Sequence, residues 1–97
     1  MVIWSRIAKS DLRAIYDYIA NDSRYYAKKV AQDIREKTDL LSELPGMGRV
    51  VPEMGDKNIR ELSLYSYRII YEIEHQQVFI LTIVHKRRDL QNLKIKD

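Results

Sequence analysis

The spacing of apolar residues changes from helical to strand-like at Pro45-Gly46, and this change divides the chain into two halves. Before it, apolar residues recur every three or four positions, as on one face of an α-helix. They form two stripes: Ala8, Leu12, Ile15 and Ile19, then Ala27, Val30, Ile34, Leu41 and Leu44. Only Asn21-Asp22-Ser23 separates the stripes, and these residue types favour turns and helix caps. The first half therefore predicts two helices in an antiparallel hairpin.

The second half reads as strands. Residues 67–74 alternate between apolar and polar, residues 78–84 are almost wholly apolar as in a central strand, and residues 59–64 are a third candidate. A short apolar run, 2–4, precedes the first helix, and Pro52 makes the extended piece after Gly48 an edge or a bend. The prediction is one domain over residues 1–97 in the order β-α-α-β-β-β. Its fold class is α+β, with the helical hairpin on one face of a small antiparallel sheet.

The connection between the last two strands decides which residues meet across them. His75-Gln76-Gln77 lacks the Gly and Asn that favour two-residue turns, so we expect a slightly longer loop. An even number of loop residues places Arg68 on the face of His85, and an odd number aligns it with Val84 and Lys86. In either register Arg68 approaches the basic end of the last strand.

Basic charge gathers at that end. The chain carries 17 Lys and Arg against 14 Asp and Glu, a net charge of +3. Residues 85–97 hold five of the former and two of the latter, so they account for the whole surplus (5 − 2 = 3). The cluster His85-Lys86-Arg87-Arg88 has two interpretations: solvated charge that closes a strand, or a site for an anion. Arginine forks match phosphate and carboxylate geometry, so nucleic acid and acidic protein surfaces are both possible ligands.

Other candidate residues also have competing interpretations. Arg68 could form a structural pair with Glu61 or Glu72 across the sheet, or Glu61 could act as a general base beside it. Tyrosines could stack on bases, but Tyr67 and Tyr71 have the spacing of core strand residues. Four others crowd the helix ends, as packing or as a partner surface: Tyr16, Tyr18, Tyr25 and Tyr26.

Composition limits the remaining classes. With no Cys, two His and no Gly-rich phosphate loop, we expect no metal and no cofactor. Residues 78–84 are too few to cross a bilayer, and residues 1–6 lack a cationic leader before an apolar stretch. We therefore expect a cytoplasmic protein without a membrane partner.

The order of several motifs resembles the RelE/ParE superfamily of toxins from type II toxin–antitoxin pairs over about residues 2–90. The matching pieces are Trp4-Ser5, Ala8, Asp11-Leu12, Leu44-Pro45, Gly48-Arg49, Pro52-Glu53, Ile59-Arg60-Glu61-Leu62, Tyr67-Arg68-Ile69-Ile70-Tyr71 and Ile80 to Leu90. The resemblance implies a small twisted antiparallel sheet with a two-helix hairpin. It also implies a growth-inhibiting toxin neutralised by a co-expressed antitoxin.

The superfamily acts on two targets. RelE-like members cut messenger RNA on the ribosome without a metal, and Arg68 and Arg87 match their arginines, with Glu61 as a possible base. This sequence departs from them: only Arg60 is basic where RelE has lysines, and Leu93 stands where RelE has a tyrosine.

ParE-like members inhibit DNA gyrase. The segment 48–53 and the ending His85-x-Arg87-Arg88-Asp89-Leu90 are more similar to that branch. The favoured hypothesis is therefore a ParE-like gyrase inhibitor, and the alternatives are a RelE-like endonuclease and a homologue that serves only in interactions. The residues expected to bind the target are Arg60, Arg68, His85, Lys86, Arg87 and Arg88. The residues expected to bind the antitoxin are Tyr16, Tyr18 and Tyr26.

Overall fold

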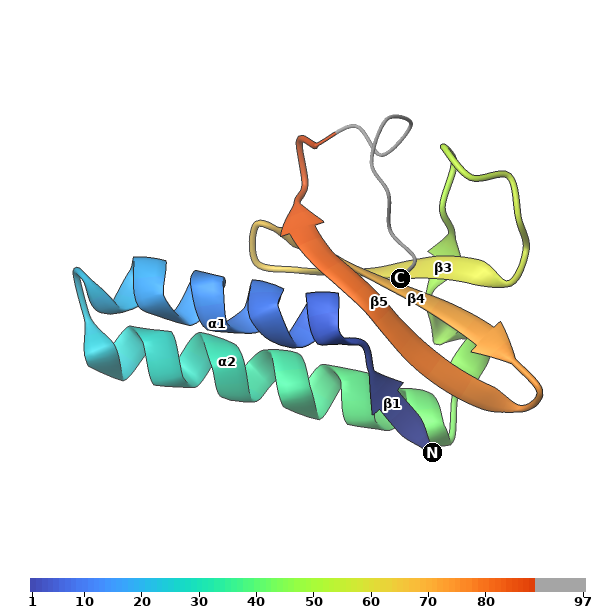
Figure 1. Ribbon diagram of the computed structural model, residues 1–97, viewed down its shortest axis with the longest axis horizontal. Coiled ribbons are helices and arrows are strands. Elements are labelled where there is room, and N and C mark those ends of the chain that lie inside the picture. The colour runs from blue at the N-terminus through green and yellow to red at the C-terminus, as the bar shows by residue number, and fades with distance from the viewer. Residues whose placement is uncertain (89–97) are drawn as a thin grey trace.

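The computed structural model describes residues 1–88 and contains two long helices and a five-stranded sheet (Figure 1). Helices α1 (Arg6–Ala20) and α2 (Arg24–Asp39) form the predicted antiparallel hairpin. Ser5 and Ser23 cap them, because each hydroxyl accepts a hydrogen bond from the backbone N–H three residues further on. Regular α-helix ends at Asp39, and two short 3-10 segments follow, Leu40–Ser42 and Pro45–Met47. Leu44, between them, is exposed rather than part of the core.

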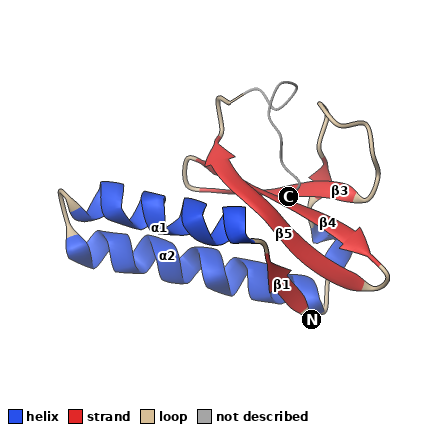
Figure 2. Cartoon of the chain, in the orientation of Figure 1, coloured by secondary structure: helices blue, strands red, loops and turns tan. Residues whose placement is uncertain are grey.

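The strands are β1 (Val2–Trp4), β2 (Arg49–Val50), β3 (Ile59–Leu64), β4 (Tyr67–Glu74) and β5 (Gln77–His85), in the spatial order β1-β5-β4-β3-β2. Both helices lie on one face of this sheet (Figure 2), which confirms the α+β class and the position of the hairpin. The sheet is mixed, however, and not wholly antiparallel, since β1 runs parallel to β5. The N–H of Ser5 donates to the carbonyl oxygen of Ile80, so the same junction that ends β1 starts α1 over β5.

Each face of the sheet has its own apolar core. On the helix side, Leu12 and Ile34 pack with sheet residues such as Ile69 and Ile80. On the other side lies a smaller cluster to which the connection between β2 and β3 contributes: Val51, Ile59, Ile70, Leu81 and Val84, with Met54 and Phe79 against it. Among residues 1–88, it is thus a loop and not a helix that packs on the second face. No helix within residues 1–88 is long and apolar enough to cross a membrane.

The turn between β4 and β5 is tighter than the sequence predicts. Glu74 pairs with Gln77, so the loop is His75 and Gln76 alone, and the expected longer loop was wrong. Both residues have positive φ, 51° and 64°, the conformation of a type I′ hairpin turn. Left-handed backbone costs roughly 1–2 kcal/mol per residue without glycine. The hydrogen bonds and side-chain pairs of the long β4–β5 ladder offset that cost. The sequence of the turn alone contains no sign of this contribution, so it does not predict a two-residue loop.

A bulge then changes the register predicted from the turn. Near the turn Tyr71 pairs with Ile80, but Ile70 pairs with Thr82, which leaves Leu81 as the extra residue. Beyond the bulge Arg68 lies opposite Val84. The loop has two residues, an even number, but because of the bulge Arg68 is aligned with Val84, as a loop with an odd number of residues would align it.

Side chains of α1 and its cap satisfy the backbone at this bulge. The Ser5 hydroxyl donates to the carbonyl oxygen of Leu81 at 2.8 Å. The Asp11 carboxylate accepts from the N–H of Ile83 at 3.0 Å and also from the hydroxyl of Thr82. Two polar residues of the helical half thus determine how the last strand is aligned.

Candidate functional site

Arg68 lies in β4 on the sheet face away from the helices and is only 7% exposed. Its Nε donates to Oε1 of Glu61 at 2.5 Å. Its two terminal nitrogens donate to the two carboxylate oxygens of Glu53, at 2.9 and 2.8 Å, in a bidentate pair. The hydrogen bonds to Glu53 raise the pKa of the Arg68 guanidinium; burial opposes this shift, and the bond to Glu61 adds to it. The guanidinium is permanently charged and turned into the protein.

Glu61, from β3, is shared between two arginines. Its second oxygen accepts from Nε of Arg49 at 2.6 Å, and the Glu61 side chain is 1% exposed. The predicted structural pair between Arg68 and Glu61 is therefore present. Because both of its oxygens face guanidinium groups, the Glu61 carboxylate is closed to a substrate. Glu53 and Arg49 complete this ion cluster, and sequence analysis did not single them out as site residues although both belong to the quoted motifs.

The segment after β5 folds back over the same region. The N–H of Lys86 donates to the carbonyl oxygen of Ser66 at 2.9 Å, and the N–H of Arg88 donates to that of His85 at 3.0 Å. One terminal nitrogen of Arg68 also donates to the carbonyl oxygen of Arg88, at 3.1 Å. The side chains of residues 85–88 are exposed. This end of the sheet therefore presents exposed cations on a segment whose backbone is bonded to Arg68.

Two predicted target-binding residues remain, Arg60 and His85, and only Arg60 lies away from this end of the sheet. Arg60 pairs with Tyr71, so strand alternation places it on the opposite face from Arg68. Its guanidinium donates to the carbonyl oxygens of Lys57 and Gly48, at 3.1 and 2.9 Å. His85 stacks edge-to-face on Tyr67 with 6.3 Å between ring centroids. The structure thus gathers Arg68 and residues 85–88 at one end of the sheet and separates Arg60 from them.

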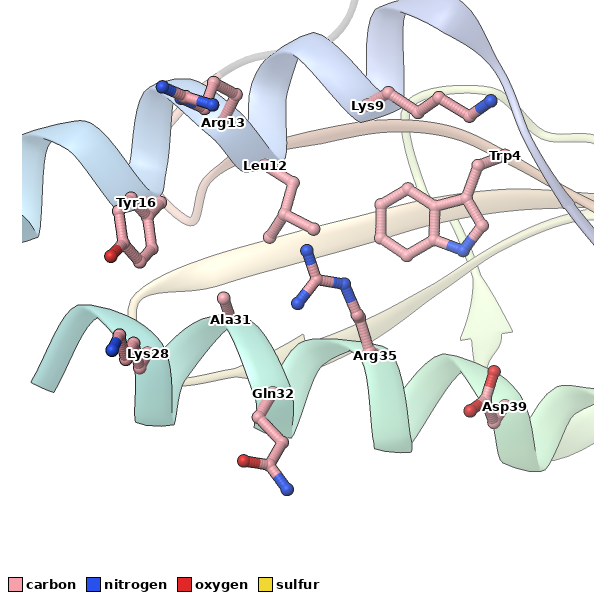
Figure 3. A pocket seen from close by; sticks show the side chains of 10 residues that line it. All are labelled: Trp4, Lys9, Leu12, Arg13, Tyr16, Lys28, Ala31, Gln32, Arg35 and Asp39. Atoms are coloured by element: carbon pink, nitrogen blue, oxygen red, sulfur yellow. The ribbon is translucent and has the colours of Figure 1, made fainter. Parts of the chain in front are cut away.

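A groove of about 950 Å³ runs between α1 and α2 (Figure 3). Its apolar lining comes from Trp4, Leu12 and Ala31, and Tyr16 lies at one end. Four cations also line it: Lys9, Arg13, Lys28 and Arg35. The groove combines an apolar strip with positive charge, so it suits a segment that is both apolar and acidic.

The predicted antitoxin tyrosines only partly coincide with this groove. Tyr16 lines it, whereas Tyr18 and Tyr26 do not and are 75% and 46% exposed. Tyr26 packs edge-to-face on Tyr65, whose hydroxyl donates to the carboxylate of Asp33. That hydrogen bond is the main reason that the pKa of Tyr65 rises to about 12. Within residues 1–88, no group of three His, Asp or Glu side chains is placed to hold a metal ion.

Comparison with known proteins resolves the family. A family model described as the ParE toxin of the type II toxin–antitoxin system parDE matches residues 2–90. The chain belongs to this ParE toxin family. Toxin RelE2 of Caulobacter vibrioides is 34% identical over 88 residues, which are 90% of this chain and 96% of that protein. The predicted superfamily and the type II toxin class are thereby confirmed.

Solved structures agree with this ParE-family assignment. A chain of the chromosomal ParDE system of P. aeruginosa is similar with a TM-score of 0.72 and 29% identity, over 87% of this chain and 92% of that one. The RelBE2 toxin–antitoxin complex of Mycobacterium tuberculosis (TM-score 0.61, 21% identity, 88% and 95% covered) shares the fold. So does a mutant of E. coli RelE in the free state (TM-score 0.63, 17% identity, 90% and 83% covered).

Proposed function

We propose that this ParE-family toxin inhibits DNA gyrase and binds it through the exposed cations at the end of β5. The observation that carries the proposal is the closed ion cluster around Arg68 and Glu61. A RelE-like nuclease requires an arginine open to the RNA phosphate and a base open to the 2′-hydroxyl. Here Arg68 is 7% exposed and engaged by two carboxylates, and the carboxylate proposed as a base is held by two arginines. Of the three residues proposed for catalysis, Arg87 alone is exposed, and an arginine by itself supplies no base.

The cations that stay accessible favour binding over catalysis. Lys86, Arg87 and Arg88 are exposed, and no carboxylate within residues 1–88 forms an ion pair with them. Exposed cations of one sign speed association with an acidic surface and make it sensitive to salt. They supply no proton acceptor. This supports an inhibitor that acts by occupying its target.

The test is inhibition of supercoiling by purified gyrase, with relaxed plasmid as substrate. The unchanged chain is expected to inhibit, and the triple variant Lys86→Ala, Arg87→Ala, Arg88→Ala is expected to lose at least about tenfold in potency. Arg24→Ala, Lys28→Ala, Lys29→Ala is the matched control, because it removes the same charge from the exposed surface of α2. Unchanged plasmid topology at high toxin excess contradicts the proposal.

A parallel assay on ribosomes programmed with message tests the alternative. Codon-spaced cleavage by the purified chain, abolished by Arg87→Ala, favours the endonuclease. Message that stays intact, together with inhibited gyrase, favours the proposal.

We further propose that an antitoxin neutralises the toxin by placing an acidic amphipathic segment in the groove between α1 and α2. The apolar strip and the four cations there match such a segment, and Tyr16, Tyr18 and Tyr26 extend the surface along the hairpin. Arg35→Glu is expected to weaken binding of the antitoxin encoded beside the toxin gene by about tenfold, measured by calorimetry. Lys57→Glu, an equal charge reversal outside the groove, is the control. Equal affinities of the two variants contradict this site.

A further inference from the structure

We infer that Arg68 is a positioning residue that clamps the β2–β3 connection and the segment after β5 into one rigid, target-facing edge. The clamp itself follows from contacts within the chain. Its consequence for target binding rests on the proposed function. Arg68 would then influence the target without touching it, through the cations of residues 86–88.

The clamp consists of one guanidinium that bonds three separate parts of the chain. Glu61 belongs to β3, Glu53 to the β2–β3 connection, and Arg88 to the segment after β5. The same terminal nitrogen donates to Oε2 of Glu53 and to the carbonyl oxygen of Arg88, at 2.9 and 3.1 Å. Both flanking segments rise from the sheet on the side away from the helices (Figure 1). Arg68 thus ties together two segments that are far apart in sequence.

Only arginine can make this set of contacts. Its planar fork directs five N–H groups along several edges at once, whereas lysine offers a single nitrogen. The Arg68→Lys variant keeps the charge beside Glu61 or Glu53 but cannot serve both of them and Arg88. The Arg68→Lys substitution therefore removes the clamp while it keeps the buried positive charge, so the effects of the two can be measured apart.

Within residues 1–88, the exposed cations of residues 86–88 form no ion pair with a carboxylate. The carboxylates of Glu53 and Glu61 are instead paired with Arg68 and Arg49. The cluster thus orders the segment through the backbone of Arg88, while the side chains of residues 86–88 stay exposed.

The direct test is a distance measurement in the full chain, which has no native cysteine to interfere. Spin labels on Lys57→Cys and Arg87→Cys report the separation of the two clamped segments by double electron–electron resonance. A narrow distance distribution is expected with Arg68 in place, and about a twofold broader one with Arg68→Lys or Glu53→Gln. Arg13→Lys, in an exposed pair with Asp17, is the matched control and should leave the distribution narrow.

Two variants keep the test decisive. If Arg68→Lys fails to fold, Glu53→Gln still removes half of the bidentate pair from a loop position. Equal widths in the control and in Glu53→Gln overturn the clamp.

Gyrase inhibition by the same variants, without spin labels, tests the functional consequence. About a tenfold loss of potency is expected for Glu53→Gln, assayed at a temperature at which circular dichroism shows the variant folded, because the cations lose their arrangement and not their number. Full potency of Glu53→Gln overturns the positioning role. If the unchanged chain does not inhibit gyrase, the proposed function fails while the distance measurement still decides the clamp.

Discussion

The backbone N–H of Gly48 donates a 2.9 Å hydrogen bond to the hydroxyl of Tyr71, which is completely buried in β4. The Tyr71 hydroxyl in turn donates to the carbonyl oxygen of Pro45 at 2.7 Å. The Tyr71 hydroxyl thus bridges the backbones of Pro45 and Gly48, between the helical half and the edge strand β2. The contact is so close that a Cβ on Gly48 would lie 2.6 Å from the hydroxyl and 2.5 Å from the carbonyl oxygen of Glu61.

The Gly48→Ala substitution is therefore expected to lower the free energy of unfolding by about 1–3 kcal/mol, as overpacking does in other cores. The obstructing atoms are backbone and a buried ring, neither of which can move aside cheaply. Gly46→Ala is the control, because a Cβ there meets no atom within 4 Å. Urea denaturation of both variants checks the prediction, and equal midpoints would contradict it.

The Tyr71→Phe substitution is expected to cost about 1–3 kcal/mol, because it leaves the buried N–H of Gly48 and the carbonyl oxygen of Pro45 without their partner. Tyr25→Phe removes the same hydroxyl from a side chain that is 79% exposed, and should be nearly neutral. Thermal unfolding distinguishes the two. A melting temperature for Tyr71→Phe equal to that of Tyr25→Phe would show that the hydroxyl bridge contributes nothing.

The helical half of this fold was largely predictable, because its elements depend on local spacing and caps. Ser5 and Ser23 stand where the apolar stripes begin, and both cap helices. The register at Arg68 was not predictable, because it depends on the bulge at Leu81. Ser5 bonds to the backbone of Leu81, and Asp11 bonds to the backbone of Ile83. Those contacts join residues more than 70 positions apart, and no local pattern reports them.

The candidate site was predictable only in part, because some of its features depend on local sequence and others on contacts between distant segments. The basic residues after β5 could be found from charge alone, and those that the structure describes, Lys86, Arg87 and Arg88, are exposed. The closed state of Arg68 and Glu61 needed the fold of the β2–β3 connection, which brings Glu53 to Arg68. A charged residue in a strand looks alike in sequence whether it faces solvent or an ion cluster.

Asp11 is expected to contribute more to stability than an ordinary surface carboxylate. Asp11→Ala removes the acceptor of the Ile83 N–H and of the Thr82 hydroxyl, and Thr82 is only 4% exposed. The expected loss is about 2–3 kcal/mol, since hydrogen bonds to charged groups are among the stronger ones. Asp17→Ala breaks an exposed i,i+4 pair with Arg13 and should cost at most about 0.5 kcal/mol. Similar unfolding free energies for the two variants would contradict the role of Asp11 at the bulge.

Tyr65 is expected to ionise with a pKa of about 12, above the ordinary value of 10, because its hydroxyl donates to the carboxylate of Asp33. The folded protein therefore favours the neutral phenol. This contribution to stability is fully present below pH 10 and is lost as the pH rises toward 12. Ultraviolet titration of the unchanged chain minus that of Tyr65→Phe isolates this group. The Asp33→Asn variant should return the step toward pH 10, and an unshifted step would refute the assignment.

Glu61→Gln separates a structural role of this carboxylate from a catalytic one. The change leaves the buried guanidinium of Arg68 without one of its two carboxylate partners, and breaking a buried pair typically costs about 3–5 kcal/mol. Much of the stability of a small domain, about 5–15 kcal/mol, would be lost. If Glu61 is structural, toxicity in growing cells falls in proportion to the folded protein that circular dichroism detects, and growth at lower temperature restores it. Glu74→Gln, at the exposed end of β4, is the control. A fully folded Glu61→Gln protein without toxicity would instead identify Glu61 as a residue that acts directly on the target.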